Sequence, residues 1–184
     1  MPRPLSFPPT FLSLAFIVLT LLPAGRSGMA AERQVLPTCA KFELLSAAQK
    51  HSTTDLLAAV RMRNWADASY AAQQLRTVEE PHSSFWFAWL ILEGHMRGDQ
   101  KDAVARLQRV ADHGCPMAQS ALSLLHAAGK GVPLDWPLAY KWAALAATAG
   151  DEGGKKLRDD IARLHPEAVA EGKRLAADFK PAAW

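Results

Sequence analysis

Apolar residues recur at three- and four-residue intervals along most of the chain, and short groups of glycine, proline and polar residues separate these stretches. The interval matches one face of an α-helix. It is clearest from Trp65, which is followed by the apolar residues Ala68, Ala71, Ala72 and Leu75. Because the separating groups are short, consecutive helices are expected to pack as antiparallel hairpins. The pattern therefore predicts an all-α fold.

Residues with strong local preferences mark where these helices begin and end. Asp99 and Asp135 are predicted N-caps, because a carboxylate there accepts hydrogen bonds from the first free N–H groups. Gly114 and Gly150 are predicted helix stops, because glycine enters the left-handed conformation without strain. The segment 153–156 (GGKK) is interpreted as a corner. Four helices are expected in the N-terminal half: about residues 40–50, a segment from Thr53 or Thr54 to a corner at Asn64, a segment from Trp65 that ends at Glu79, Glu80 and Pro81, and one from Ser83 or Ser84 to about Glu93. The remaining expected helices cover about residues 100–113, 117–127, 136–148, 155–164 and 166–179.

Two of the expected helix pairs repeat at a spacing of 36 residues. Gly150 follows Gly114 at this distance, and Ala139 follows Ala103. Small residues at matched positions let neighbouring helices approach closely, and a fixed period of this size is typical of stacked helix pairs. The other matched positions are Val110 with Ala146 and Ala111 with Ala147.

The segment 118–150 resembles a Sel1-like repeat, a relative of the tetratricopeptide repeat. Its G-x-G-V-x-x-D corner is intact, and it departs from the family pattern at Ser123 and His126, where glycine and an aromatic residue are usual. The resemblance implies a right-handed α-solenoid of antiparallel helix hairpins that presents a surface to a partner. It is carried by Ala118, Gln119, Leu122, Gly129, Gly131, Val132, Pro133, Asp135, Ala139, Trp142, Ala146, Ala147 and Gly150.

The rest of the chain matches this family less closely. The unit at about 83–114 matches only in its second helix, and its corner, which contains Gly94 and Gly98, is interpreted as shorter. The domain organisation expected from these features is a signal peptide (1–30), a lead-in (31–39), tetratricopeptide-like pairs (40–114), a Sel1-like repeat (115–150) and C-terminal capping helices (151–184).

The first thirty residues have the pattern of a secretory signal peptide. Arg3 precedes the apolar run 11–22, which is shorter than the roughly 20 residues that a transmembrane helix needs. Cleavage is expected before Ala31, with cleavage before Glu32 as the second choice. Arg26 follows the run closely, so an uncleaved membrane anchor is the alternative. The expected location is the periplasm or the outside of the cell, with no stable membrane span after cleavage.

Composition and charge exclude several classes of function. Hydrophobic residues make up 49% and charged residues 21%, a globular balance. The formal charge of +3 includes two arginines of the leader, and no clustered basic face indicates nucleic-acid binding. The six histidines lack the i, i+3 or i+4 spacing of metal ligands on a helix, and no G-x-S-x-G motif is present. We therefore expect no cofactor, no metal site and no catalytic residues.

Cys39 and Cys115 are the only cysteines and are the candidate disulfide. Two cysteines in an oxidising compartment usually pair. Each, however, is expected at the start of a first helix, two units apart, which exceeds the roughly 7 Å that a disulfide spans between Cα atoms. A lead-in that folds back would allow the bond. Burial of both as small apolar residues is the alternative.

Trp86 and Glu93 are the candidate partner-binding residues. The first helix of each pair lines the concave face in related solenoids, and Trp86, Leu90 and Glu93 form a stripe that is expected to face away from the core. Aromatic residues often anchor interfaces. A helix buried on two sides is the alternative.

These features together favour an adaptor or scaffold that binds another protein, and the expected partner is a component of the cell envelope. The alternatives are an enzyme or ligand-binding protein for cell-wall or β-lactam-like molecules, as in some exported relatives of the repeat family, and a small subunit that only stabilises a larger complex. The exported relatives carry regular cysteine pairs within each repeat, which this chain lacks.

Overall fold

The computed structural model describes residues 47–75 and 81–183, and all regular structure within these ranges is helical. Eight α-helices and one 3-10 turn follow one another and pack largely as sequential pairs, which confirms the all-α prediction. The elements are α2 (Ala47–Arg61), α3 (Trp65–Gln74), α4 (Pro81–Leu92), α5 (Gln100–Asp112), α6 (Pro116–Ala128), α7 (Trp136–Thr148), α8 (Glu152–Leu164), η3 (Pro166–Ala168) and α9 (Val169–Ala177).

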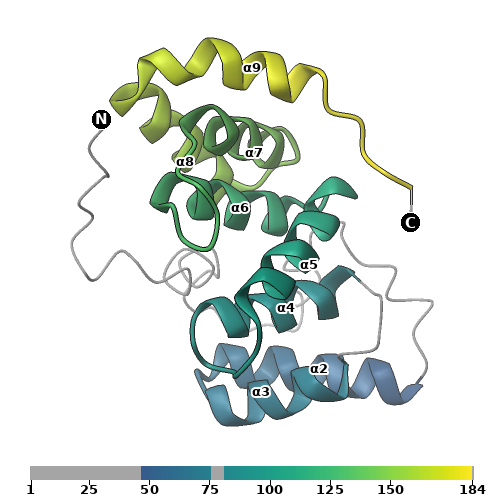
Figure 1. Ribbon diagram of the computed structural model, residues 1–184. Helices are drawn as coiled ribbons and strands as arrows, with labels where there is room; N and C mark the ends of the chain where they lie inside the picture. Colours follow the sequence, from purple (N-terminus) through teal and green to yellow (C-terminus); the bar gives the residue numbers. More distant parts are fainter. Residues whose placement is uncertain (1–46, 76–80, 184) are drawn as a thin grey trace.

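The pairs stack along the molecule in chain order. Figure 1 shows α2 and α3 at one end, α4 and α5 above them, and α8 and α9 at the other end. Helix α7 packs on α6, α8 and α9, so it is the centre of the C-terminal half. After α9 the chain leaves the helix and runs back toward the end of α5 (Figure 1). The last residues thus contact a helix that lies much earlier in the sequence.

Equivalent helices of consecutive pairs begin and end 36 residues apart, which is the spacing of the matched residues in the sequence. Helix α7 begins and ends 36 residues after α5, and α8 begins and ends 36 residues after α6. The corners 93–99 and 129–135 each contain seven residues. The prediction of a shorter first corner was therefore wrong: this corner lacks the G-V-P residues but has the same length. Consecutive pairs with equal helix and loop lengths are consistent with a helical repeat.

The predicted caps of the two matched helices are confirmed. The side chain of Asp99 accepts hydrogen bonds from the N–H groups of Lys101 and Asp102, and Asp135 accepts one of 2.8 Å from Leu138. Gly114 and Gly150 have φ angles of 84° and 87°. In this left-handed region a Cβ atom is strained, so glycine ends both helices in the same way.

Three predicted boundaries in the N-terminal half were wrong, and the first is the end of α3, which lies at Gln74 and not at Glu79, Glu80 and Pro81. Thr53 and Thr54 do not cap a helix, because α2 continues through both of them, and Thr53 is fully buried. Helix α4 begins at Pro81 rather than at Ser83 or Ser84, since proline fits the first turn, where its missing N–H is not needed. The corner at Asn64 is confirmed: it caps α3, and Arg63 before it has a φ of 55°. Residues 40–46 of the expected first helix lie outside the described residues, as do the leader and the lead-in.

The segment 153–156 is helical and not a corner. Asp151 caps α8, accepting a hydrogen bond of 2.7 Å from the N–H of Gly154, so the helix starts three residues earlier than predicted. A Cβ atom on Gly154 would lie 2.5 Å from the Cβ of Ala146 on α7. The glycine is therefore needed for the close approach of the two helices, and its sequence signal was mistaken for that of a turn.

Two clusters of buried apolar side chains form the core. The larger one runs from α2 to α6 and also includes Trp142 of α7. Its largest fully buried side chains are Trp89, Trp142 and Phe85. The smaller cluster joins the end of α6 to α7, α8 and η3, and Trp136 and Tyr140 are its largest members. Helix α4 is apolar on nearly all sides, so it lies in the middle of the N-terminal core rather than on its surface.

Candidate functional site

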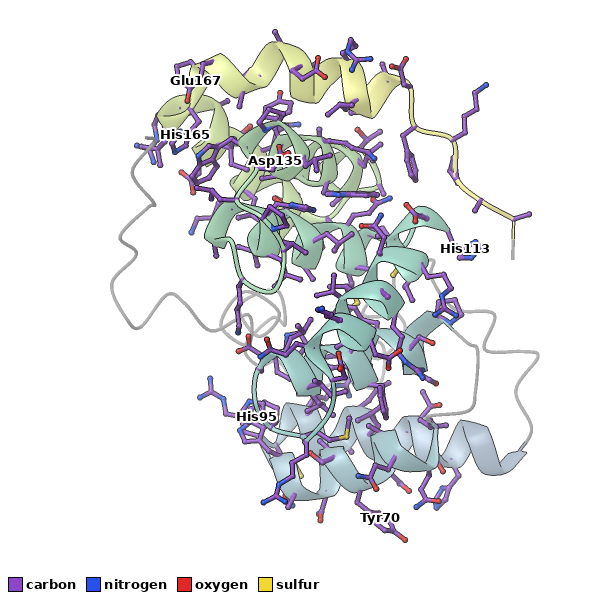
Figure 2. All side chains as sticks on the ribbon, in the orientation of Figure 1. Tyr70, His95, His113, Asp135, His165 and Glu167 are labelled. Carbon is purple, nitrogen blue, oxygen red and sulfur yellow. The ribbon has the colours of Figure 1, made fainter. Side chains whose placement is uncertain are left out.

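The residues of the G-x-G-V-x-x-D motif build the corner between α6 and α7. Gly129 and Gly131 have φ angles of 64° and 72°, and the N–H of Asp135 donates to the carbonyl of His126 at 3.1 Å. The Nδ1 atom of His126 lies 3.3 Å from the carbonyl oxygen of Pro133. Asp135, labelled in Figure 2, then caps α7. The motif therefore specifies one turn geometry and offers no reacting group. The remaining motif residues that lie buried are Ala118, Gln119, Leu122, Ala139, Trp142 and Ala146, while Val132 and Ala147 are half-buried.

Trp86 and Glu93 do not lie where the sequence placed them. The expectation that they face away from the core was wrong: Trp86 is 4% exposed and makes edge-to-face contacts with Phe85 and Trp89. The Glu93 side chain is 5% exposed and forms an ion pair of 3.2 Å with Lys130. The physical reason is that α4 is packed on both sides, the alternative that the sequence left open. Contact of these two residues with a partner stays a prediction.

Cys115 is buried at the N-cap of α6 and is 3% exposed. It is disulfide-bonded, and no free cysteine occurs among the described residues. The alternative of a buried free thiol is therefore wrong for Cys115. Cys39, the other half of the candidate disulfide, lies outside the described residues, so the bond between these two cysteines stays a prediction.

Tryptophan and histidine rings stack at two matching places in the fold. Trp65 lies on His95 with ring centroids 4.2 Å apart, and Trp136 lies on His165 at 3.7 Å, with interplanar angles of 10° and 12°. Each tryptophan is the first residue of the second helix of a pair, and each histidine lies in the loop after the first helix of the next pair. The two histidines lie at opposite ends of the array (Figure 2). These stacks fasten one pair to the next, a role that the sequence did not suggest.

The shifted pKa values follow from burial and ion pairing rather than from a reactive cluster. Burial lowers the pKa of His126, His95 and Lys141, because each loses contact with water in its charged form. A hydrogen bond from Arg174 lowers the pKa of Glu171 on the surface of α9. No group of three or more histidine, cysteine or acidic residues that could hold a metal ion occurs within 47–75 and 81–183.

The C-terminal segment after α9 packs across α7 and the end of α5. Phe179 packs edge-on against Trp142 with ring centroids 5.7 Å apart, and the Nζ atom of Lys141 lies over both rings, at 4.0 Å from Trp142 and 5.3 Å from Phe179. The backbone of Ala182 meets the end of α5, beside His113, which Figure 2 labels. Sequence reasoning missed this contact. The proline at position 181 signals that the helix has ended but not where the chain goes.

Large apolar side chains on the surface are few. Among the described residues they are Met62, 81% exposed, Tyr70, 71% exposed, and Leu164. Tyr70 projects from the outer face of α3 at one end of the array (Figure 2). Tyrosine is among the residue types enriched at the energetic centres of protein interfaces.

Comparison with known proteins finds no matching family model, no matching curated protein and no matching solved structure. The likeness to Sel1-like repeats therefore rests on the residues of 118–150 themselves. With respect to membranes, none of the helices in the described parts of the chain combines the length and the apolar character that a span requires.

Proposed function

We propose that this chain is an exported protein-interaction module, an adaptor or scaffold whose fold is a short right-handed α-solenoid of Sel1-like and tetratricopeptide-like helix pairs. One observation carries the proposal. The bounds of α5 and α6 recur in α7 and α8 after 36 residues, with aspartate N-caps at Asp99 and Asp135 and left-handed glycines at Gly114 and Gly150. Repeats of this kind serve chiefly to present an extended binding surface.

The character of the described residues supports binding in preference to chemistry. The perturbed histidines are separated in the fold: His95 stacks on Trp65, and His126 meets the backbone of Pro133. Each thus has a packing role in a corner. Tyr70 and Met62, by contrast, are large side chains that the described part of the chain leaves largely exposed. Side chains of this kind contribute most to protein interfaces.

The proposed cellular location and the proposed class of partner both rest on the predicted signal peptide. A chain with a signal peptide over 1–30 would act in the periplasm or outside the cell, and its partner would be another protein of the cell envelope. The proposal includes no nucleic acid, cofactor or metal.

Photo-crosslinking in the native cell tests the proposal. A photoreactive residue replaces Tyr70, Lys101 or Lys156 in separate variants, because these exposed positions sample α3, α5 and α8. We expect a specific protein adduct from at least one position, removed by an excess of unlabelled chain. The absence of any adduct from all three positions, together with binding of a fluorescent penicillin or hydrolysis of a chromogenic β-lactam, would overturn the proposal in favour of a ligand-binding or enzymatic role.

A further inference from the structure

The residues 178–183, called the C-terminal strap, lie across a surface made by α5 and α7. The strap surface consists of Asp112, His113 and Gly114 at the end of α5, and of Lys141 and Trp142 on α7. These two helices are the second helices of consecutive pairs. The strap therefore bridges the repeat boundary from outside, at the point where the 36-residue units meet.

Two contacts of Ala182 with this surface use the main chain of the strap. The N–H of Ala182 donates to the carbonyl of Asp112 at 2.8 Å, and the carbonyl of Ala182 lies 3.0 Å from Nδ1 of His113, which donates when it carries the proton. The side chain of residue 182 takes no part in either bond. Main-chain pairing of this kind accepts any extended segment and is indifferent to most of its sequence.

Specificity comes from one aromatic ring. Phe179 of the strap is half-buried, its ring makes an edge-to-face contact with Trp142, and the Lys141 ammonium lies over it. A partly buried cation that lies over one aromatic ring, that of Trp142, favours a second π-system over an aliphatic side chain. The strap therefore meets this surface through an aromatic residue and, three positions later, through a residue that uses its main-chain N–H and C=O.

The strap is anchored less firmly than the helix that precedes it. A Cβ atom on Gly172 of α9 would lie 2.7 Å from the Tyr140 ring, so α9 is closely packed on α7. In the strap, Ala182 and its neighbours are exposed, and Pro181 only approaches Gly114, whose added Cβ would lie 3.7 Å from it. Few buried contacts and exposed hydrogen bonds are typical of segments that open locally while the rest of the fold stays intact.

We propose that the strap surface is a peptide-binding site that the strap occupies in cis, and that its partner is an extended peptide segment with an aromatic residue and, three positions later, a small residue. The inference rests on the proposed function as an interaction module and names its site. A tethered segment acts at an effective concentration on the order of millimolar, so the strap competes strongly with any such peptide. Release of the strap should therefore raise the apparent affinity by at least about tenfold.

The test measures binding of a fluorescent peptide with the sequence of residues 178–184 (DFKPAAW) to the full chain and its variants. Phe179→Ala releases the strap by removing its ring. Lys180→Ala is the matched control, an exposed neighbour in the same segment. We expect saturable binding that is at least about tenfold tighter for Phe179→Ala than for the unchanged chain or for Lys180→Ala. A peptide with alanine in place of its phenylalanine should not bind.

A second variant keeps the test decisive if Phe179→Ala perturbs the fold. Ala182→Pro removes the N–H that donates to Asp112 and changes only an exposed residue. Faster hydrogen exchange of strap amides would verify release. A released strap without peptide binding, or equal binding of the peptide that lacks phenylalanine, refutes the site. If photo-crosslinking in cells still identifies a partner, the proposed function stands and only its location at the strap surface falls.

Discussion

Gly154→Ala decides whether the segment 153–156 is a solvent-facing corner or a closely packed first turn. In the structure, the added methyl carbon would lie 2.5 Å from the Cβ of Ala146 and 3.0 Å from the backbone nitrogen of Ala147. Ordinary contact between carbon atoms is about 3.5–4.0 Å. Neither neighbour is the end of a flexible side chain, so α7 and α8 must move apart by about 1 Å, judged against that contact distance.

The magnitude follows from two opposing effects. Overpacking of a well-packed site costs about 1–3 kcal/mol. Replacing glycine by alanine inside a helix contributes about 1 kcal/mol in favour of folding. Because the close neighbours of Gly154 are backbone and a Cβ atom, we place the cost in the upper part of its range. The expected net loss of unfolding free energy is therefore about 1–2 kcal/mol.

Urea unfolding followed by circular dichroism measures this loss. With an m-value of about 2 kcal/mol/M, the midpoint should fall by about 0.5–1 M at constant m. Lys155→Ala, at an exposed neighbouring position, is the control and should stay within about 0.5 kcal/mol of the unchanged chain. A Gly154→Ala variant that is as stable as the parent, or more stable, would refute the close approach of α7 and α8.

Three further predictions concern the repeat glycine, a buried histidine and the cysteines. Gly150→Ala should lower the free energy of unfolding by about 1–2 kcal/mol in the same urea assay, because the φ of 87° strains any residue with a Cβ atom, even though no other atom lies nearby. Gly150→Asn should lower it by less, since asparagine tolerates this conformation. Burial lowers the pKa of His126, so the folded chain binds fewer protons than the unfolded chain between the lowered value and 6.5, and stability should fall as the pH drops from 7 through this window. His126→Gln should reduce that pH dependence, and equal slopes for the variant and the unchanged chain would contradict the assignment. Mass spectrometry of a non-reducing digest should find the peptides of Cys39 and Cys115 joined, and recovery of either as a free thiol before reduction would disprove the pairing.

Helix ends were predictable wherever one residue determines them. Asp99, Asp135, Gly114 and Gly150 act through their own side chain or φ angle, within three residues of their position in the chain. Such local effects are the same in a peptide and in a folded domain. The order of the helices and the 36-residue period therefore follow from the amino-acid sequence alone.

The side of α4 that faces the core could not be predicted from such local effects. Periodicity assigns an inner and an outer side to a helix only when polar residues occupy one of them, and α4 has apolar residues almost all round. Whether Trp86 meets solvent or core depends on what packs on its second side, and that is a property of helices far along the chain. The expectation that Trp86 and Glu93 face away from the core failed at this step.

By itself, the sequence determined the all-α class, the caps at Asp99 and Asp135, the glycine stops at Gly114 and Gly150, and the 36-residue period, because each depends on interactions between near neighbours. Only the tertiary structure decided which glycine is a turn and which permits close packing, and where the chain after α9 goes. Gly150 and Gly154 are alike in sequence, yet one is needed for its φ angle and the other for its contact with Ala146. The strap reaches Asp112 across about seventy residues, a separation over which no local pattern carries information.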